Sequence, residues 1–162
     1  MQELVISMIE KRGVKMEEIA EIVFELQKNY LPISLDMCLD VVKSVLEKRE
    51  VQNAVLTGIS LDIAAEKGQV EEPLISILLA DEPLYGVDEI LALSITNIYG
   101  SIAFTNFGYI DRLKMGVLAK LNRPTNVQCN TFLDDLVAAI AAAACSKLAH
   151  GFEKRKTMQE QD

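Results

Sequence analysis

The uneven placement of charge along the chain is the sequence feature that most constrains its fold. Residues 1–87 contain 16 acids and 8 bases, which accounts for the whole net charge of -8. Residues 88–150 contain only five acids and five bases. These five acids form three clusters, namely Asp88 with Glu89, Asp111 alone, and Asp134 with Asp135. A segment so poor in charge is expected to be largely buried, so carboxylates within it need a specific reason to be there.

Apolar residues recur with the period of an α-helix. Ile19, Ile22, Val23 and Leu26 follow the i, i+3, i+4, i+7 rule, with acids on the other faces. Further helices are expected after Ser34 as an N-cap, over residues 52–67 with Gly68 as a C-cap, after Pro73, and over the alanine-rich residues 133–149. No pair of alternating runs joined by Asn-Gly or Asp-Gly indicates a hairpin. The sequence predicts an all-α fold, a multi-helix bundle.

The length of 162 residues suits one domain with one hydrophobic core. We expect a single helical domain over residues 1–150, with a charged half (1–87) and an apolar, site-bearing half (88–150). A loop is expected over residues 121–126, where Asn and Pro oppose helix continuation. The polar residues 151–162 are expected to form a flexible tail.

Residues 90–110 carry no charge, so a membrane span has to be considered. Ser, Thr, Asn and Gly occur at eight of these positions, and two Asn side chains would be costly in lipid. We therefore expect a buried helix with a break near Gly100 rather than a transmembrane segment, and leave peripheral membrane contact open.

Charge and cysteine usage bear on partners and location. A net charge of -8 argues against binding to nucleic acid, which repels an acidic surface. The three cysteines are an odd number without C-x-x-C spacing, and the N-terminus lacks the pattern of a signal peptide. These features predict a cytoplasmic protein with reduced thiols.

The residues exclude several kinds of site and leave one. There is no phosphate-binding glycine loop, and His150 is the only histidine, which excludes a His-rich zinc site. Magnesium prefers carboxylate oxygens. Two helices that each bring an acid doublet into the interior would form a cluster that needs a cation. The alternative is that the doublets cap helices, since residues 131–134 match a capping box loosely and acids suit a first helical turn.

The chain also resembles a known family. Residues 84–90, 99–102, 105–111 and 130–140 resemble the phosphatidylglycerophosphatase A family, most closely its short branch labelled low temperature requirement C. The resemblance spans about residues 51–150. It implies a mainly helical fold and a magnesium-dependent phosphatase that removes the terminal phosphate of phosphatidylglycerophosphate.

By position, the resemblance implies roles for three motifs. Asp88-Glu89 and Asp134-Asp135 match the family's Asp-Glu and Asp-Asp and would hold magnesium, whereas Asp111-Arg112 matches its Asp-Arg. We expect metal-assisted hydrolysis of a phosphomonoester. Arg112 would clamp the phosphate, and Asp111 would orient Arg112 or accept a proton from water.

Two rival functions remain open. One is a non-enzymatic helical interaction protein in which the doublets are caps. The other is a phosphatase for a water-soluble phosphate ester that uses the same metal site. Broad apolar faces within residues 38–63 and 133–149 predict a homo-oligomer under either interpretation.

Overall fold

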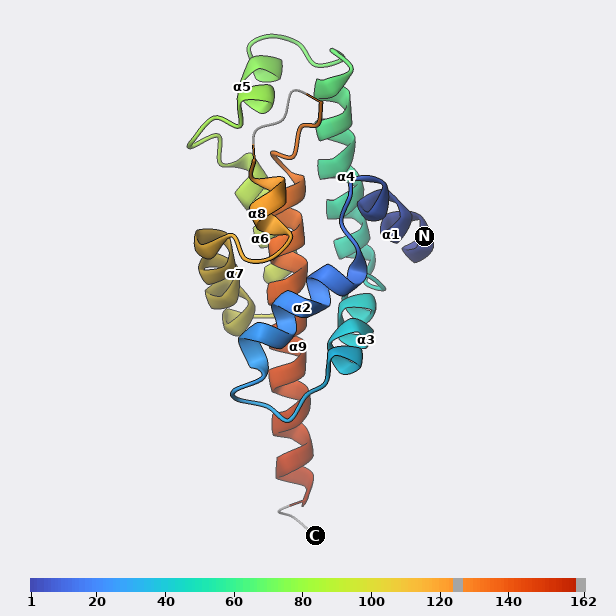
Figure 1. Cartoon of the computed structure of the whole chain (residues 1–162), viewed down its shortest axis with the longest axis vertical. Helices are drawn as coiled ribbons and strands as arrows, with labels where there is room; N and C mark the ends of the chain where they lie inside the picture. The colour runs from blue at the N-terminus through green and yellow to red at the C-terminus, as the bar shows by residue number, and fades with distance from the viewer. Residues whose placement is uncertain (124–126, 160–162) are drawn as a thin grey trace.

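The computed structural model describes residues 1–123 and 127–159 (Figure 1). Within them the chain forms nine helices and no strand, so the all-α prediction is confirmed. The helices are α1 (Gln2–Lys11), α2 (Met16–Gln27), α3 (Leu35–Val45), α4 (Arg49–Glu66), α5 (Leu74–Ala80), α6 (Val87–Thr96), α7 (Ser101–Leu113), α8 (Leu118–Leu121) and α9 (Leu133–Gln159).

Helix α9 forms the centre of the molecule. It runs along the long axis in Figure 1 and packs against α2, α3, α4, α6, α7 and α8. Every residue from 131 to 146 is buried, and the run of alanines lets the surrounding helices approach its backbone closely. The helix expected over 133–149 is therefore confirmed as the core helix.

Helix α9 continues through Gln159, whereas we expected a flexible tail from residue 151. Phe152 still packs against the hydrophobic core, which explains why the helix does not end near residue 150. Residues 160–162 and 124–126, the second within the expected loop, lie outside the described residues.

Three helix ends lie where the capping residues of the sequence predict them. Ser34 Oγ accepts a hydrogen bond of 3.2 Å from the Met37 N–H at the start of α3. Gly68 follows the end of α4 with a φ of 66°, a conformation that glycine adopts without steric cost. Pro73 directly precedes α5, as expected for a residue near a first helical turn.

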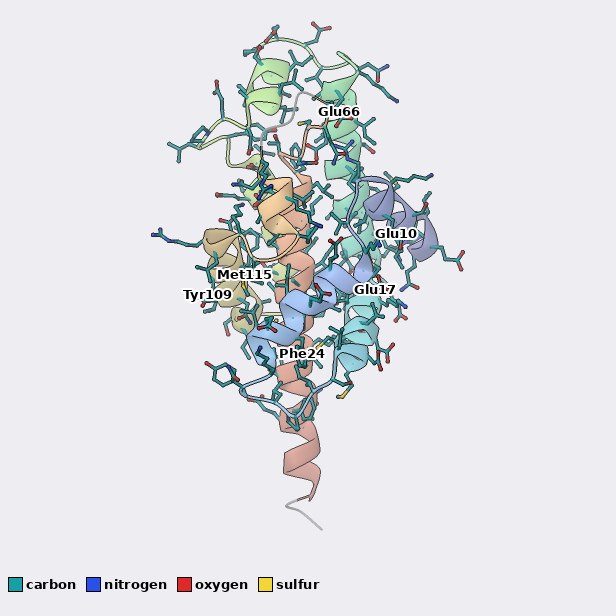
Figure 2. The ribbon with its side chains drawn as sticks, in the orientation of Figure 1. Glu10, Glu17, Phe24, Glu66, Tyr109 and Met115 are labelled. Atoms are coloured by element: carbon teal, nitrogen blue, oxygen red, sulfur yellow. The ribbon has the colours of Figure 1, made fainter. Side chains whose placement is uncertain are left out.

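The uncharged stretch 90–110 is broken near Gly100, as expected, into α6 and α7. It is buried on one face only, because α6 and α7 cover α9 and turn their other face outward. Ile90 and Tyr109 are exposed, and Figure 2 shows Tyr109 on the outer side of α7. The expectation of a buried helix was therefore wrong for that outer face.

Among the described helices, one stretch, Leu133–Lys154, is long and apolar enough to cross a membrane. However, 72% of its most apolar window is buried inside the protein. The apolar side chains of this stretch are therefore largely covered by the helices that pack around it.

The apolar faces that predicted a homo-oligomer are covered within one chain. Cys38, Val42, Val55 and Ile59 are fully buried, and so are the alanines of α9. These faces therefore no longer favour a homo-oligomer, and the oligomeric state stays a prediction.

Helices α4 and α9 cross closely at Gly58. A Cβ atom at this position would lie 2.6 Å from Leu136 Cδ1 and 2.9 Å from Phe132 Cβ. Only glycine allows this approach, which brings the second half of α4 against the first turn of α9.

Candidate functional site

One end of the bundle contains a cavity of about 210 Å³ lined mainly by acids, which we call the carboxylate cavity. It lies where the α5–α6 loop, the first turn of α6, the last turn of α7 and the first turn of α9 meet. Five of the six predicted site residues line it: Asp88, Glu89, Asp111, Asp134 and Asp135. Asp81 and Glu82 from the loop add two more carboxyl groups. The fold therefore brings together all three acid clusters of the charge-poor half.

The α5–α6 loop is held in an unusual backbone conformation at the edge of this cavity. Asp81, Leu84 and Gly86 have φ angles of 48°, 68° and 73°. This left-handed region is unfavourable for Leu, so the loop stores strain beside the site. Gly86 starts α6 and places Asp88 and Glu89 in its first turn, where carboxylates interact favourably with the helix dipole.

Within the part of the chain that the structure describes, Lys114 is the single base that lines the carboxylate cavity. Its Nζ atom lies 2.6 Å from Asp111 Oδ1 and 2.8 Å from Asp134 Oδ2. Burial opposes the charge of this ammonium, but the charges of Asp134 and Asp111 raise the pKa of Lys114 above its usual value. Lys114 is therefore a fixed positive charge between two of the predicted carboxylates.

Arg112 does not line the carboxylate cavity, and its side chain is exposed in the last turn of α7. Successive residues of a helix point about 100° apart, so the inward position of Asp111 turns Arg112 outward. The cation inside the cavity is Lys114 instead. The phosphate-clamping role of Arg112 stays a prediction that a variant can test.

The start of α9 bears on the alternative that the acids cap helices. Asp134 Oδ1 accepts a hydrogen bond of 2.9 Å from the Asp135 N–H, so this carboxylate does satisfy a first-turn donor. Thr131 does not form the expected capping box, because its hydroxyl donates to the Leu78 carbonyl at 2.7 Å. Asp134 thus caps with one oxygen and binds Lys114 with the other.

The remaining cap of α9 comes from a distant helix. Asp62 of α4 accepts hydrogen bonds of 3.1 Å from both the Phe132 N–H and the Leu133 N–H. Its side chain is fully buried. Burial raises the pKa of Asp62 to about 7, although these two N–H groups favour its charged form.

Asp135 is the most strongly perturbed acid of the carboxylate cavity. It is almost fully buried, and burial together with the charges of Asp134 and Asp111 raises its pKa to about 9. Lys114 lowers this pKa but does not cancel the effect. The cavity therefore favours an additional positive charge, either a proton or a metal ion.

The chemistry of the donor set fits a hard divalent cation. In the described part of the chain, Asp88 Oδ1 is buried and has no hydrogen-bond partner. An unpaired buried carboxylate oxygen is costly, and burial accordingly raises the pKa of Asp88. Oxygen ligands of this kind are those that magnesium prefers.

The described side chains, those of residues 1–123 and 127–154, include no ready-made group of three or more His, Cys, Asp or Glu that could hold a metal ion. The position of Lys114 gives a physical reason, because its ammonium lies between Asp111 and Asp134 and keeps both oxygens engaged. Ligation by Asp134 Oδ2 would require exchange of this ion pair for a bond to metal.

Comparison with known proteins identifies relatives of the chain. A family model described as Phosphatidylglycerophosphatase A matches residues 5–150. The chain belongs to this family. Family membership suggests a phosphatase-like activity, and it confirms the resemblance that the motifs indicated.

Two relatives of the chain come from Bacillus subtilis. The uncharacterised protein YutG is 58% identical over 143 residues, which covers 88% of this chain and 86% of YutG. The uncharacterised protein YpjQ is 52% identical over 145 residues, which covers 88% of this chain and 81% of YpjQ. The crystal structure of the low temperature requirement C protein from Listeria monocytogenes has a TM-score of 0.91, with 58% identity and coverage of 94% of this chain and 96% of that chain.

Sequence reasoning did not single out Lys114, which lines the carboxylate cavity, or Asp62, which holds the start of α9. Lys114 follows Asp111 by three positions, the spacing of a helical ion pair, so its contact with Asp111 could have been predicted from the sequence. Asp62 had only a weak signal, as an acid between apolar residues of α4. Its partners lie 70 and 71 positions away.

Proposed function

We propose that the chain is a magnesium-dependent phosphomonoester hydrolase that acts in the carboxylate cavity. The observation that carries the proposal is the convergence of three acid clusters around one base in a partly enclosed space. Membership of the phosphatidylglycerophosphatase A family supports the same class of activity. A cap alone does not explain why acids from three different helices line one cavity.

Asp88, Glu89, Asp134 and Asp135 would hold magnesium. Asp88 contributes an oxygen without another partner, and Asp135 contributes a buried carboxyl group whose pKa is raised by burial and by the neighbouring carboxylates. When bound, magnesium would offset the charge of the phosphate and activate a water molecule.

Lys114 and Asp111 would act on the substrate and on water. The Lys114 ammonium is held in the cavity and would donate to phosphate oxygens, which stabilises the charge that develops during hydrolysis. Asp111 orients this ammonium through a contact of 2.6 Å and would accept a proton from the attacking water.

For the substrate we propose a phosphorylated lipid such as phosphatidylglycerophosphate, converted to phosphatidylglycerol and phosphate. Exposed apolar side chains at the edge of the cavity support this choice. Leu84 lines the cavity and is fully exposed, while Val87 and Ile90 are exposed next to Asp88 and Glu89. Such side chains suit an amphiphilic substrate and peripheral contact with a membrane by a cytoplasmic protein.

Phosphate release tests the proposal. Phosphatidylglycerophosphate in mixed micelles and glycerol phosphate in solution are each incubated with the protein, with and without magnesium. We expect magnesium-dependent release that is faster from the lipid. Faster release from glycerol phosphate would favour the enzyme for a soluble ester. Release no greater than that of an Asp134→Asn control, with no effect of magnesium on the melting temperature, would favour the non-enzymatic interaction protein.

A further inference from the structure

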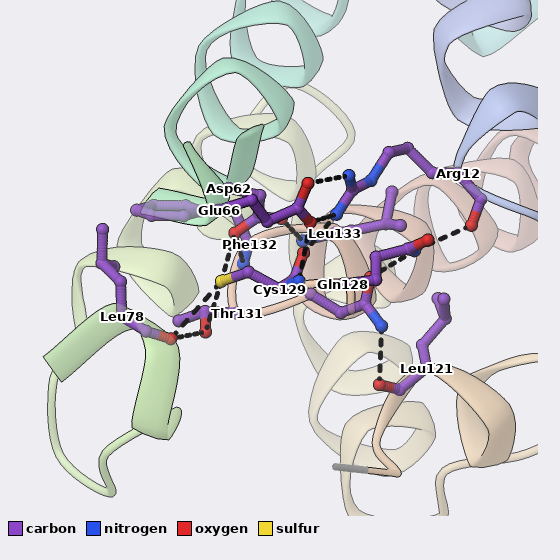
Figure 3. A network of polar contacts seen from close by, with 11 residues as sticks. Arg12, Asp62, Glu66, Leu78, Leu121, Gln128, Cys129, Thr131, Phe132 and Leu133 are labelled. Carbon is purple, nitrogen blue, oxygen red and sulfur yellow. Dashed lines mark hydrogen bonds and ion pairs between the residues drawn. The ribbon is translucent and has the colours of Figure 1, made fainter. Parts of the chain in front are cut away.

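Two acids one turn apart on α4 hold the segment that enters α9. Asp62 accepts from the Phe132 and Leu133 N–H groups, each at 3.1 Å. Glu66 accepts from the Cys129 N–H at 2.7 Å. Figure 3 shows both carboxylates directed at this segment. Helix α4 therefore binds three backbone donors within five consecutive residues.

Arg12, in the turn between α1 and α2, makes further contacts with the same segment. Arg12 forms a two-point ion pair with Glu66, with distances of 3.0 and 2.6 Å, and also donates to the Cys129 carbonyl (Figure 3). Gln128 Nε2 in turn donates to the Arg12 carbonyl at 3.0 Å. A paired arginine fork of this kind fixes orientation as well as distance.

The same segment is also held from the opposite side. Thr131 Oγ1 donates to the Leu78 carbonyl at the end of α5, at 2.7 Å. Asn130 Nδ2 donates to the Leu121 carbonyl of α8 at 3.1 Å. Residues 128–133 are thus tied to four other parts of the fold immediately before Asp134 and Asp135.

We propose that Asp62 is a positioning residue for the carboxylate cavity, because it fixes the first turn of α9 and so sets where Asp134 and Asp135 lie. The inference rests on the proposed function for its consequence in metal binding. Asp62 itself is fully buried and does not line the cavity, so it acts through its contacts with Cys129, Phe132 and Leu133 at the entry to α9.

The carboxylate is specifically suited to this task. Asp62 Oδ1 accepts from the Phe132 N–H and Oδ2 from the Leu133 N–H. An Asn side chain has one acceptor oxygen and would leave one of these buried donors unpaired. The Asp62→Asn variant therefore keeps the size of the side chain and loosens one anchor of the first turn.

The test compares Asp62→Asn with Val42→Ala, both measured in the full chain. Val42 is fully buried in α3 and is absent from the network, so its truncation lowers stability without altering the start of α9. Hydrogen exchange of the amides in residues 132–136 reports the positioning directly. Binding of manganese, followed by electron paramagnetic resonance, reports its effect on the carboxylates.

For Asp62→Asn we expect faster exchange in residues 132–136 and a manganese dissociation constant raised about tenfold, as for other residues that orient metal ligands. For Val42→Ala we expect neither change. Unaltered exchange in Asp62→Asn, or a manganese affinity equal to that of Val42→Ala, would overturn the inference.

A wild-type protein that binds no manganese would count against the proposed function. Hydrogen exchange would then still decide whether Asp62 positions the first turn of α9. If Asp62→Asn does not fold in buffer, both variants and the wild type are measured in a stabilising osmolyte, which favours the folded state of each, and we expect the same faster exchange in residues 132–136 of Asp62→Asn. Unchanged exchange under those conditions would also overturn the inference.

Discussion

Lys114 Nζ lies 2.8 Å from Asp134 Oδ2, so the end of α7 is joined to the start of α9 by an ion pair between residues 20 positions apart. Asp134 is buried and Lys114 is about three-quarters covered. Breaking such a pair leaves the buried Asp134 charge without its partner.

Lys114→Gln is expected to lower phosphate release about 100-fold, since it removes the donor proposed to stabilise the transition state. The unfolding free energy should also fall by about 2 kcal/mol, because Asp134 loses its partner. Arg112→Gln is the matched control and should lower release much less, because Arg112 does not line the cavity. Initial rates and urea unfolding measure both effects. An equal loss in Arg112→Gln would restore the role that the family resemblance gives to Arg112.

Asp88→Asn is expected to raise the unfolding free energy in EDTA at pH 8 by about 1 kcal/mol, or about 3 °C in melting temperature. The reason is that Asp88 carries an unpaired buried oxygen whose charged form burial disfavours. The variant should also respond less to added magnesium than the wild type. Glu21→Gln removes one exposed charge from α2 and should change neither quantity. A lower melting temperature for Asp88→Asn in EDTA would contradict the prediction.

Asp62 should make stability depend on pH. Burial raises its pKa in the folded protein to about 7, whereas the unfolded chain releases this proton near pH 4. Between these values the folded state binds more protons, so the wild type should lose up to about 4 kcal/mol relative to Asp62→Asn as the pH rises from 4 to 7. Urea unfolding of both proteins across this range measures the difference. A difference that does not vary with pH would show that the carboxylate is already ionised at pH 4.

Gly58→Ala is expected to destabilise the protein by about 2 kcal/mol, because the new Cβ would lie 2.6 Å from Leu136 Cδ1. Gly108→Ala provides the contrast, since a Cβ there meets nothing within 4 Å inside α7. That variant should be more stable by up to about 1 kcal/mol, the helix preference of Ala over Gly. Chemical unfolding of the two variants compares their stabilities directly. Equal effects would show that the α4–α9 crossing accommodates a Cβ atom at position 58.

The architecture and most of the acidic site could be predicted because their signals are local. Period-3.6 patterning marked the helices, and Ser34 and Gly68 marked two of their ends. The near absence of charge after residue 87 singled out the three acid clusters. All of these acids line one cavity, as the hypothesis of convergence required.

What the residues alone could not determine is which side chains meet across the bundle. Arg112 was predicted to clamp the phosphate and does not line the carboxylate cavity, whereas Lys114, three residues after Asp111, lies between two carboxylates. The alternative of a capping box placed Thr131 at the start of α9, whereas two N–H groups there are bound by Asp62 of another helix.

The sequence by itself determined that the fold is all-α, where several helices begin or end, and which acids stand out in the charge-poor half. Only the tertiary structure decided the partner of each buried charge. The physical reason is that a hydrogen bond needs its two atoms within about 3 Å, and that distance depends on how distant helices cross, as α4 and α9 do at Gly58.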